Sequence, residues 1–458
     1  MSWRDNPPRA VRRLGRRDFL RLAALLPVAA VFPSMSPSGA RAQVQPGAQL
    51  RMWWWGEEEA VGITRWLEDT LTRFRADTGI SIAPTRMETD QVVEQFTDAA
   101  AAGDVPDLQY FWNGIYHMEN VWRGYVEPLN GLVSRAVLRR AGATRFSIFE
   151  GKQYRAGFYA DGFGIAYNKV LFDRARLDAD NPPRTWDAFL AACDRLKAAG
   201  IIPFGGGVKD GFFGDWYFTN ALIQHLNSAA EAISLFIGDL DWRQLQYREH
   251  WDRLEELYRL GFLNQDITEL EHFDGLAQFD AGRFAMCLYV SPSLSNAQVR
   301  LGQGNVGFMV MPVFGKGRMA GIPILDAHGF GIPSGARDKQ NAARFIEYMH
   351  TKERLQAMWT LSRQIPADEA FDSSIVDDPL ISQVYDTWVA GPHNPYIGDL
   401  MPTRFWTDVM FVASQRIVAG EIGAEQAAEL AARVTEQWKV ANPDTVNNYA
   451  RWGRGLGL

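Results

Sequence analysis

The sequence predicts an α/β fold in which a parallel sheet carries helices on both faces. Two observations predict it. Apolar segments of strand length alternate with longer segments of helical spacing between residues 50 and 111. Alternation of this kind produces βαβ units, whose helices cover both faces of the sheet. The 416 residues that follow residue 42 are also enough for two domains of ordinary size.

The first part of the chain is expected to supply three strands and two helices. Strands are expected at 50–55, 80–85 and 108–111, and the second helix at 91–102. The first helix ends near Gly79, and its apolar stripe consists of Ile63, Trp66, Leu67, Thr70, Leu71 and Phe74.

The later elements are predicted from caps, glycines and apolar spacing. Thr185 is the expected cap of a helix that ends at Gly200 and buries Trp186, Phe189, Leu190, Cys193 and Leu196. Gly211 to Trp216 is predicted to form a glycine-flanked aromatic loop. Strands are expected at 284–289, 306–311 and 330–332, helices near 342–349 and at 352–361, and mostly helices after residue 405.

The N-terminus carries the features of an export signal. The twin-arginine core Arg16-Arg17-Asp18-Phe19-Leu20-Arg21 precedes an apolar run from Leu22 to Phe32, and Ala40-Arg41-Ala42 resembles a cleavage site before Gln43. The apolar run is about half the ~20 residues of a membrane-spanning helix. We therefore predict that residues 1–42 are a twin-arginine signal peptide and that the mature protein is periplasmic. The alternative is an amphipathic N-terminal helix of a cytosolic protein.

Charge and composition exclude several classes of partner. Residues 43–458 contain 39 basic and 52 acidic side chains, a net charge of −13. An acidic surface disfavours nucleic acids and anionic lipids. Cys193 and Cys287 both occupy expected core positions, where buried free thiols are favoured over a disulfide. No zinc-protease, hydrolase or phosphate-loop motif occurs, so we expect no enzymatic activity, no metal and no cofactor.

Several ordered segments carry a resemblance to a known family. They are Gly151–Tyr154, Gly164–Phe172, Pro183–Phe189, Leu196–Pro203, Phe279–Met286, Val306–Pro312, Gly329–Pro333, Ala342–Ile346 and Thr351–Glu353. Together they resemble the extracellular solute-binding proteins of the family 1 type, the carbohydrate-binding subunits of ABC importers, to which maltose-binding protein belongs. The resemblance extends over nearly the whole mature chain.

The resemblance implies a two-lobe periplasmic binding protein fold with a hinge and an interlobe cleft. We expect residues 43–158 plus 318–368 in the N-terminal lobe and 159–317 plus 369–458 in the C-terminal lobe. The chain is expected to cross between the lobes near 157–161, 315–321 and 365–371. The resemblance further implies a monomer that binds a carbohydrate and delivers it to the membrane permease subunits of an ABC importer.

Candidate ligand-binding residues follow the expected strands, where α/β sheets place ligands. In the N-terminal lobe they are Trp55, Glu57, Trp112, Asn113, Tyr116, His328 and Arg363, and Asp161 lies at the hinge. Trp55 could instead belong to the sheet core, Asp161 could be a turn residue, His328 a structural histidine and Arg363 a member of an ion pair. In the C-terminal lobe they are Asp215, Trp216, Tyr289 and Ser291. Trp112 and Trp216 are expected to flank the ligand without supporting a core.

Two other functions remain open at this stage. A secreted glycan-acting hydrolase also combines tryptophan with carboxylates, but it needs two carboxyl groups roughly 5–9.5 Å apart across the scissile bond. The second open function is that of a binding protein for a non-sugar charged solute. The acidic run Glu57-Glu58-Glu59 favours a cation, whereas Arg363 and Arg404 favour an anion.

Overall fold

The computed structural model describes residues 49–89, 91–92, 94–112, 117–141 and 144–456. The predicted signal peptide, Asn113 and Tyr116 lie outside these described residues. Residues 47–458 form one compact unit. None of the described helices is long and apolar enough to cross a membrane.

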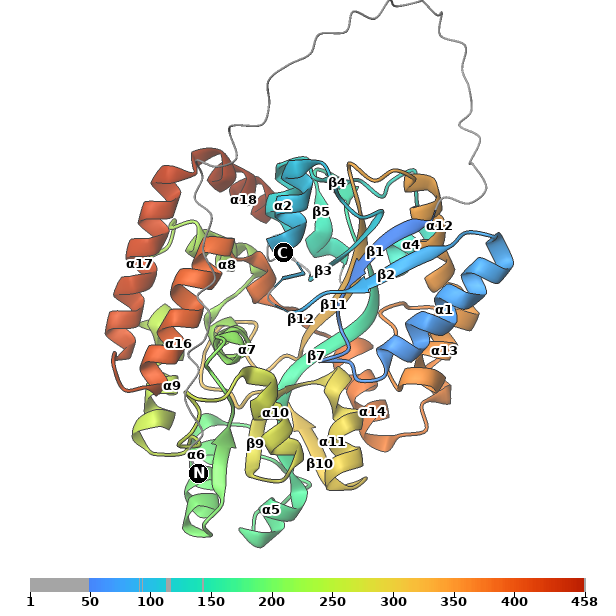
Figure 1. The fold of residues 1–458 in the computed structure, drawn as a ribbon. Coiled ribbons are helices and arrows are strands. Elements are labelled where there is room, and N and C mark those ends of the chain that lie inside the picture. Colours follow the sequence, from blue (N-terminus) through green and yellow to red (C-terminus); the bar gives the residue numbers. More distant parts are fainter. Residues whose placement is uncertain (1–48, 90, 93, 113–116, 142–143, 457–458) are drawn as a thin grey trace, which may run out of the picture. The chain divides into compact units, whose positions relative to one another are not determined.

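One large sheet runs through this unit in the order β2-β1-β3-β11-β7-β9-β8 (Figure 1). Parallel pairing joins β1 to β2 and to β3 at one end, and β8 to β9 at the other. The long strands β7 and β11 lie antiparallel to each other between these two parts. The strands are β1 (Leu50–Trp54), β2 (Ile82–Arg86), β3 (Leu108–Phe111), β4 (Val126–Glu127), β5 (Ile148–Phe149), β6 (Lys152–Gln153), β7 (Ala156–Asn168), β8 (Ile202–Gly205), β9 (Phe284–Val290), β10 (Val306–Met309), β11 (Ile324–Pro333) and β12 (Asn394–Pro395).

Helices surround the sheet. Near β1 and β2, α1 packs against α12 and α13, α6 and α10 pack on β8 and β9, and α9, α16 and α17 pack together on the side of the molecule away from β2 (Figure 1). The helices are α1 (Ile63–Thr78), α2 (Glu94–Ala102), α3 (His117–Trp122), α4 (Arg135–Arg140), α5 (Lys169–Arg174), α6 (Trp186–Ala198), α7 (Phe212–Leu222), α8 (Ala229–Phe236), α9 (Leu245–Arg259), α10 (His272–Asp280), α11 (Leu294–Leu301), α12 (Lys339–Met349), α13 (Lys352–Ser362), α14 (Pro379–Val384), α15 (Thr403–Phe405), α16 (Phe411–Val418), α17 (Ala424–Ala441) and α18 (Pro443–Gly455).

Most of the expected elements are present with boundaries shifted by a few residues. The Thr185 hydroxyl accepts a hydrogen bond from the Ala188 amide and caps α6, as predicted. Cys193 and Cys287 are buried and free, and burial raises the pKa of each thiol. Both cysteines are therefore inert core residues under ordinary conditions.

The predicted loop between Gly211 and Trp216 is wrong, because Phe212 begins α7. Gly211 precedes the helix at φ 89°, a conformation that glycine adopts without strain. Every residue of α7 after Phe212 is buried. A helix that is buried on all sides, as α7 is, shows no amphipathic period, which is why the sequence pattern did not reveal it.

Two segments predicted to connect lobes lie hydrogen-bonded side by side. The Ala160 amide donates to the Ile365 carbonyl, and the Ala367 amide donates to the Phe158 carbonyl. Residues 365–367 thus run beside the part of β7 that also pairs with β11. Asp161 lies inside this thirteen-residue strand and is not a turn residue.

Candidate functional site

The candidate site is a cavity of about 50 Å³ between β7, β11 and α7. Its walls are aromatic and acidic, and they come from segments far apart in the sequence. The lining residues are Trp55, Glu59, Thr89, Trp112, Asp161, Phe163, Phe212, Asp215, Trp216, His272, Phe273, Asp326, His328, Tyr396, Asp399 and Trp406.

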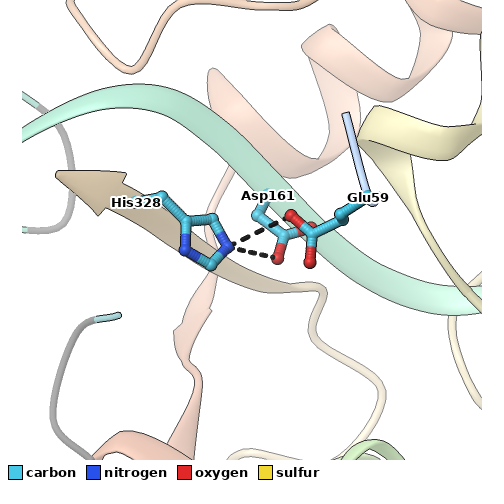
Figure 2. Close-up of side chains that lie close together, drawn as sticks. All are labelled: Glu59, Asp161 and His328. Carbon is cyan, nitrogen blue, oxygen red and sulfur yellow. Dashed lines mark hydrogen bonds and ion pairs between the residues drawn. The ribbon is translucent and has the colours of Figure 1, made fainter. Parts of the chain in front are cut away.

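A buried triad of Glu59, Asp161 and His328 forms one wall of the cavity. Figure 2 shows the imidazole directed at both carboxyl groups, and its Nε2 lies 3.2 Å from Glu59 Oε1 and 3.2 Å from Asp161 Oδ2. The register of β7 against β11 sets this geometry, since Asp326 opposes Asp161 and His328 opposes Tyr159. The Tyr159 hydroxyl also donates to Glu59 Oε1 at 3.0 Å.

The triad changes the pKa of its members. Burial alone would lower the pKa of His328, but the negative charges of Glu59 and Asp161 raise it to about 10. Burial and the neighbouring Glu59 raise the pKa of Asp161 well above its ordinary value, although His328 opposes this shift. At neutral pH the imidazole is therefore a cation held between two carboxyl groups.

The triad also has the residue types and the spacing of a metal site, since one possible ligand atom of each residue lies within 4.8 Å of the other two. Its surroundings fit a hydrogen-bonded ion cluster better. A histidine that binds a metal usually donates its second ring N–H to a carboxylate, carbonyl or water. The Nδ1 atom of His328 has no hydrogen-bond partner among the described residues.

Three further acidic residues, Asp215, Asp326 and Asp399, line the same cavity as the triad. Burial raises the pKa of Asp215 to about 7, while the hydrogen bond that Trp406 Nε1 donates to Asp215 Oδ2 opposes this shift. Burial and the nearby Asp326 raise the pKa of Asp399 well above its ordinary value. Arg155, which is fully buried, donates to the Ala327 carbonyl and lies 4.0 Å from Asp326 Oδ1.

Aromatic rings cover the rest of the cavity. The rings of Trp55 and Trp112 meet edge to face with centroids 5.5 Å apart, and Trp112 also lies 6.5 Å from Trp406. Trp55 Nε1 donates to the Thr89 hydroxyl at 2.8 Å, which holds the Trp55 ring in place. Such rings present apolar faces beside the carboxyl groups, the combination that binds the C–H faces and hydroxyl groups of sugars.

Six of the predicted site residues line the cavity: Trp55, Trp112, Asp161, Asp215, Trp216 and His328. Trp216 differs from the expectation that it supports no core. It is only 6 % exposed and contacts Phe163 and His272 at centroid distances of 5.7 and 4.1 Å. Trp216 therefore contributes to the core as well as to the cavity wall.

The structure places four predicted residues outside the lining. Glu57 accepts hydrogen bonds from the Gly62 and Thr64 amides, so it holds the N-terminus of α1. The Tyr289 hydroxyl donates to Asp280, and the Ser291 hydroxyl accepts from the Gly162 amide.

Arg363, the fourth, pairs with Asp377 and stacks on Trp359 at 3.8 Å. This is the ion-pair alternative that the sequence left open. Each of the four side chains thus makes a structural contact near the end of a strand or helix. Position in the sequence alone does not distinguish such a contact from a contact with a ligand.

Several lining residues were not among the predicted set. Two had a usable signal: Glu59 belongs to an acidic run, and Asp326 lies two residues before His328, on the same face of a strand. Others had none, because only the folded chain brings them to the cavity: His272, Phe273, Tyr396, Asp399 and Trp406.

Comparisons with known proteins identify the fold and the family. The family model described as bacterial extracellular solute-binding protein matches residues 69–382. Among solved structures, a chitin oligosaccharide binding protein matches with a TM-score of 0.76 and 21% identity over 86% of this chain and 99% of that one. A binding protein in complex with raffinose matches with a TM-score of 0.70 and 19% identity over 86% and 100% of the two chains. These likenesses confirm the predicted two-lobe α/β fold.

Curated relatives match over shorter segments. A multiple sugar-binding protein of Streptococcus mutans is 25% identical over 263 residues, which are 56% of this chain and 61% of the relative. A binding protein of Brucella abortus is 28% identical over 147 residues, 31% of this chain and 35% of the relative. The match therefore spans about a third of the Brucella protein and less than two thirds of the Streptococcus protein.

Proposed function

Because this chain belongs to the bacterial extracellular solute-binding proteins, we propose that it binds a sugar, oligosaccharide or sugar derivative between two lobes and delivers it to the permease of an ABC importer. The observation that carries this proposal is the cavity itself, in which tryptophan rings and buried carboxyl groups converge. Pyranose rings need both kinds of surface.

We propose the lobe boundaries that the sequence predicts, with residues 43–158 and 318–368 in one lobe and 159–317 and 369–458 in the other. With these boundaries, Trp55, Trp112 and His328 belong to the N-terminal lobe and Asp215, Trp216 and Asp399 to the C-terminal lobe. The cavity then receives side chains from both lobes. A ligand that touches both can stabilise a closed arrangement.

The size of the cavity supports a closed arrangement. Ligand pockets commonly have about 300–1,000 Å³, whereas this cavity has about 50 Å³. Two hydrogen bonds join the proposed lobes beside it. The Ser293 hydroxyl donates to the Glu59 carbonyl at 2.7 Å, and Gln364 Nε2 donates to the Pro292 carbonyl at 3.0 Å. Ligand access therefore requires the lobes to separate.

The first experiment is a thermal-shift screen of the purified mature protein against sugars, oligosaccharides and charged osmolytes. At a hundredfold excess over its Kd, a ligand that binds only the folded state stabilises it by about 2.7 kcal/mol and raises the melting temperature. We expect a sugar to do so, to reduce the radius of gyration in small-angle scattering, and to be recovered intact. Cleavage of that sugar, abolished when one cavity carboxyl is changed to an amide, would identify a hydrolase instead.

We also propose that the protein reaches the periplasm by the twin-arginine route and is cleaved after Ala42, since its family is extracellular. Replacing both Arg16 and Arg17 with Lys should leave the precursor in the cytoplasm, as measured by fractionation and immunoblotting. Arg12 and Arg13 lie outside the twin-arginine core, so their double replacement by Lys is the matched control and should be exported normally. Normal export of the Arg16 and Arg17 variant would exclude this route.

A further inference from the structure

The cavity contains more acidic than basic groups. Its lining includes five carboxyl groups, those of Glu59, Asp161, Asp215, Asp326 and Asp399. Two cationic side chains oppose them among the described residues, namely His328 in the lining and Arg155 behind it. All five carboxyl groups belong to residues that are no more than 4 % exposed. Water therefore screens this imbalance poorly.

Some of these buried carboxyl oxygens also lack a hydrogen-bond donor among the described residues. Asp161 Oδ1, Asp326 Oδ1 and Asp399 Oδ2 are buried and have no hydrogen-bond partner among the described residues. A buried acceptor without a donor costs about 1–3 kcal/mol, and more when it is charged. These three oxygens, on residues that line the cavity, therefore indicate a ligand that donates hydrogen bonds.

The excess negative charge also shifts the pKa values of two cavity carboxyl groups. Burial and the neighbouring carboxylates raise the pKa of Asp161 and of Asp399 well above their ordinary values, despite the opposing effects of His328 and Arg155. The protein's own cations thus do not balance these carboxyl groups. Either protons or a cationic ligand must supply the missing positive charge.

The aromatic walls favour the ligand as the source of that charge. Trp55, Trp112 and Trp406 stand beside the acidic groups, and the faces of indole rings attract cations. A neutral sugar would satisfy the free oxygens through its hydroxyl groups but would leave the charge imbalance unchanged. An ammonium group would donate to the free oxygens and would also supply part of the missing positive charge.

We propose that the sugar bound by this protein carries a protonated amine, so that the ligand class is amino sugars with a free ammonium group. This inference rests on the proposed function as a sugar-binding protein. The ammonium group would donate a hydrogen bond to the free oxygen of Asp399, the hydroxyl groups of the sugar would donate to the other free oxygens, and the sugar ring would pack against the tryptophan rings.

Calorimetric titration at pH 6 with matched sugar pairs tests this inference. The probes are glucosamine, galactosamine and the β-1,4-linked glucosamine dimer, each beside its N-acetylated form, which has a similar shape but no charge. We expect at least one amine form to bind about tenfold or more tightly than its acetylated partner. A panel in which a neutral sugar binds more tightly than every amine form would overturn the inference and leave the proposed function intact.

Variants separate the charge from the sugar ring. Asp399→Asn should lower the preference for the amine form about tenfold, whereas Asp194→Asn, which changes an exposed carboxylate on α6, should leave it unchanged. A melting curve checks that each variant is folded. An unchanged preference in folded Asp399→Asn would contradict the assigned contact. Binding of a linear diamine but of no sugar would overturn both this inference and the proposed function.

Discussion

Trp112→Ala is expected to weaken ligand binding by on the order of 2 kcal/mol or more, about 30-fold, the range for a central aromatic contact. The Trp112 side chain is only partly buried, and it lines the cavity beside Trp55, Phe212 and Trp406. Its removal exposes little core, so the free energy of unfolding should change much less than binding does. Titration calorimetry and urea unfolding measure the two effects.

Two other tryptophans serve as controls for this variant. Trp122 is also partly buried but packs against Phe149 and Tyr449, outside the cavity lining. Trp122→Ala should leave the Kd unchanged. Trp66 is fully buried under α13, where its Nε1 donates to the Arg354 carbonyl, and Trp66→Ala should cost about 3–5 kcal/mol of stability. If Trp112→Ala binds normally but unfolds as easily as Trp66→Ala, Trp112 is a core residue and the proposed site is misplaced.

His328→Gln is expected to destabilise the ligand-free protein by about 3–5 kcal/mol at pH 7, the usual effect of removing one partner from a buried ion cluster. The substitution removes the cation that lies 3.2 Å from both Glu59 and Asp161. The matched control is His272→Gln. Burial lowers the pKa of His272 to about 3, so this residue is neutral and its replacement removes no charge.

The pH dependence distinguishes a charge effect from a packing effect. The folded-state pKa of His328, about 10, lies above the unfolded value of about 6.5. Its stabilising contribution is therefore complete below pH 6.5 and is lost as the pH rises toward 10. Between pH 7 and 9 the wild-type protein should lose on the order of 2–3 kcal/mol through this residue, at about 1.4 kcal/mol per pH unit.

Urea unfolding at pH 7, 8 and 9 measures this slope. His328→Gln should show a smaller loss over the same interval, because it no longer has this proton to release, whereas His272→Gln should keep the wild-type slope. Asp215 affects stability at lower pH. Its folded-state pKa, about 7, lies above the unfolded value of about 3.9, so its stabilising contribution is lost as the pH rises from about 4 to 7. Equal slopes for wild type and His328→Gln would contradict the assignment of this loss of stability to His328.

Local sequence signals were sufficient for much of the fold. The alternation from Leu50 to Phe111 predicted β1, α1, β2, α2 and β3, and Thr185 marked the start of α6. Such signals are readable because an element with one buried side repeats its apolar residues at its own period. The same reasoning failed at α7, whose residues are buried on every side and therefore carry no period.

The sequence by itself determined the α/β class, the family resemblance and six of the residues that line the cavity. Trp55 and Trp112 could be found because side chains that follow parallel strands gather at one edge of a sheet. Only the tertiary structure decided which charged groups meet there. His328 reaches Asp161 through the register of β11 on β7, and Asp399 and Trp406 arrive from the C-terminal part of the chain. Cross-strand register and long-range packing depend on the whole chain, so no local pattern contains them.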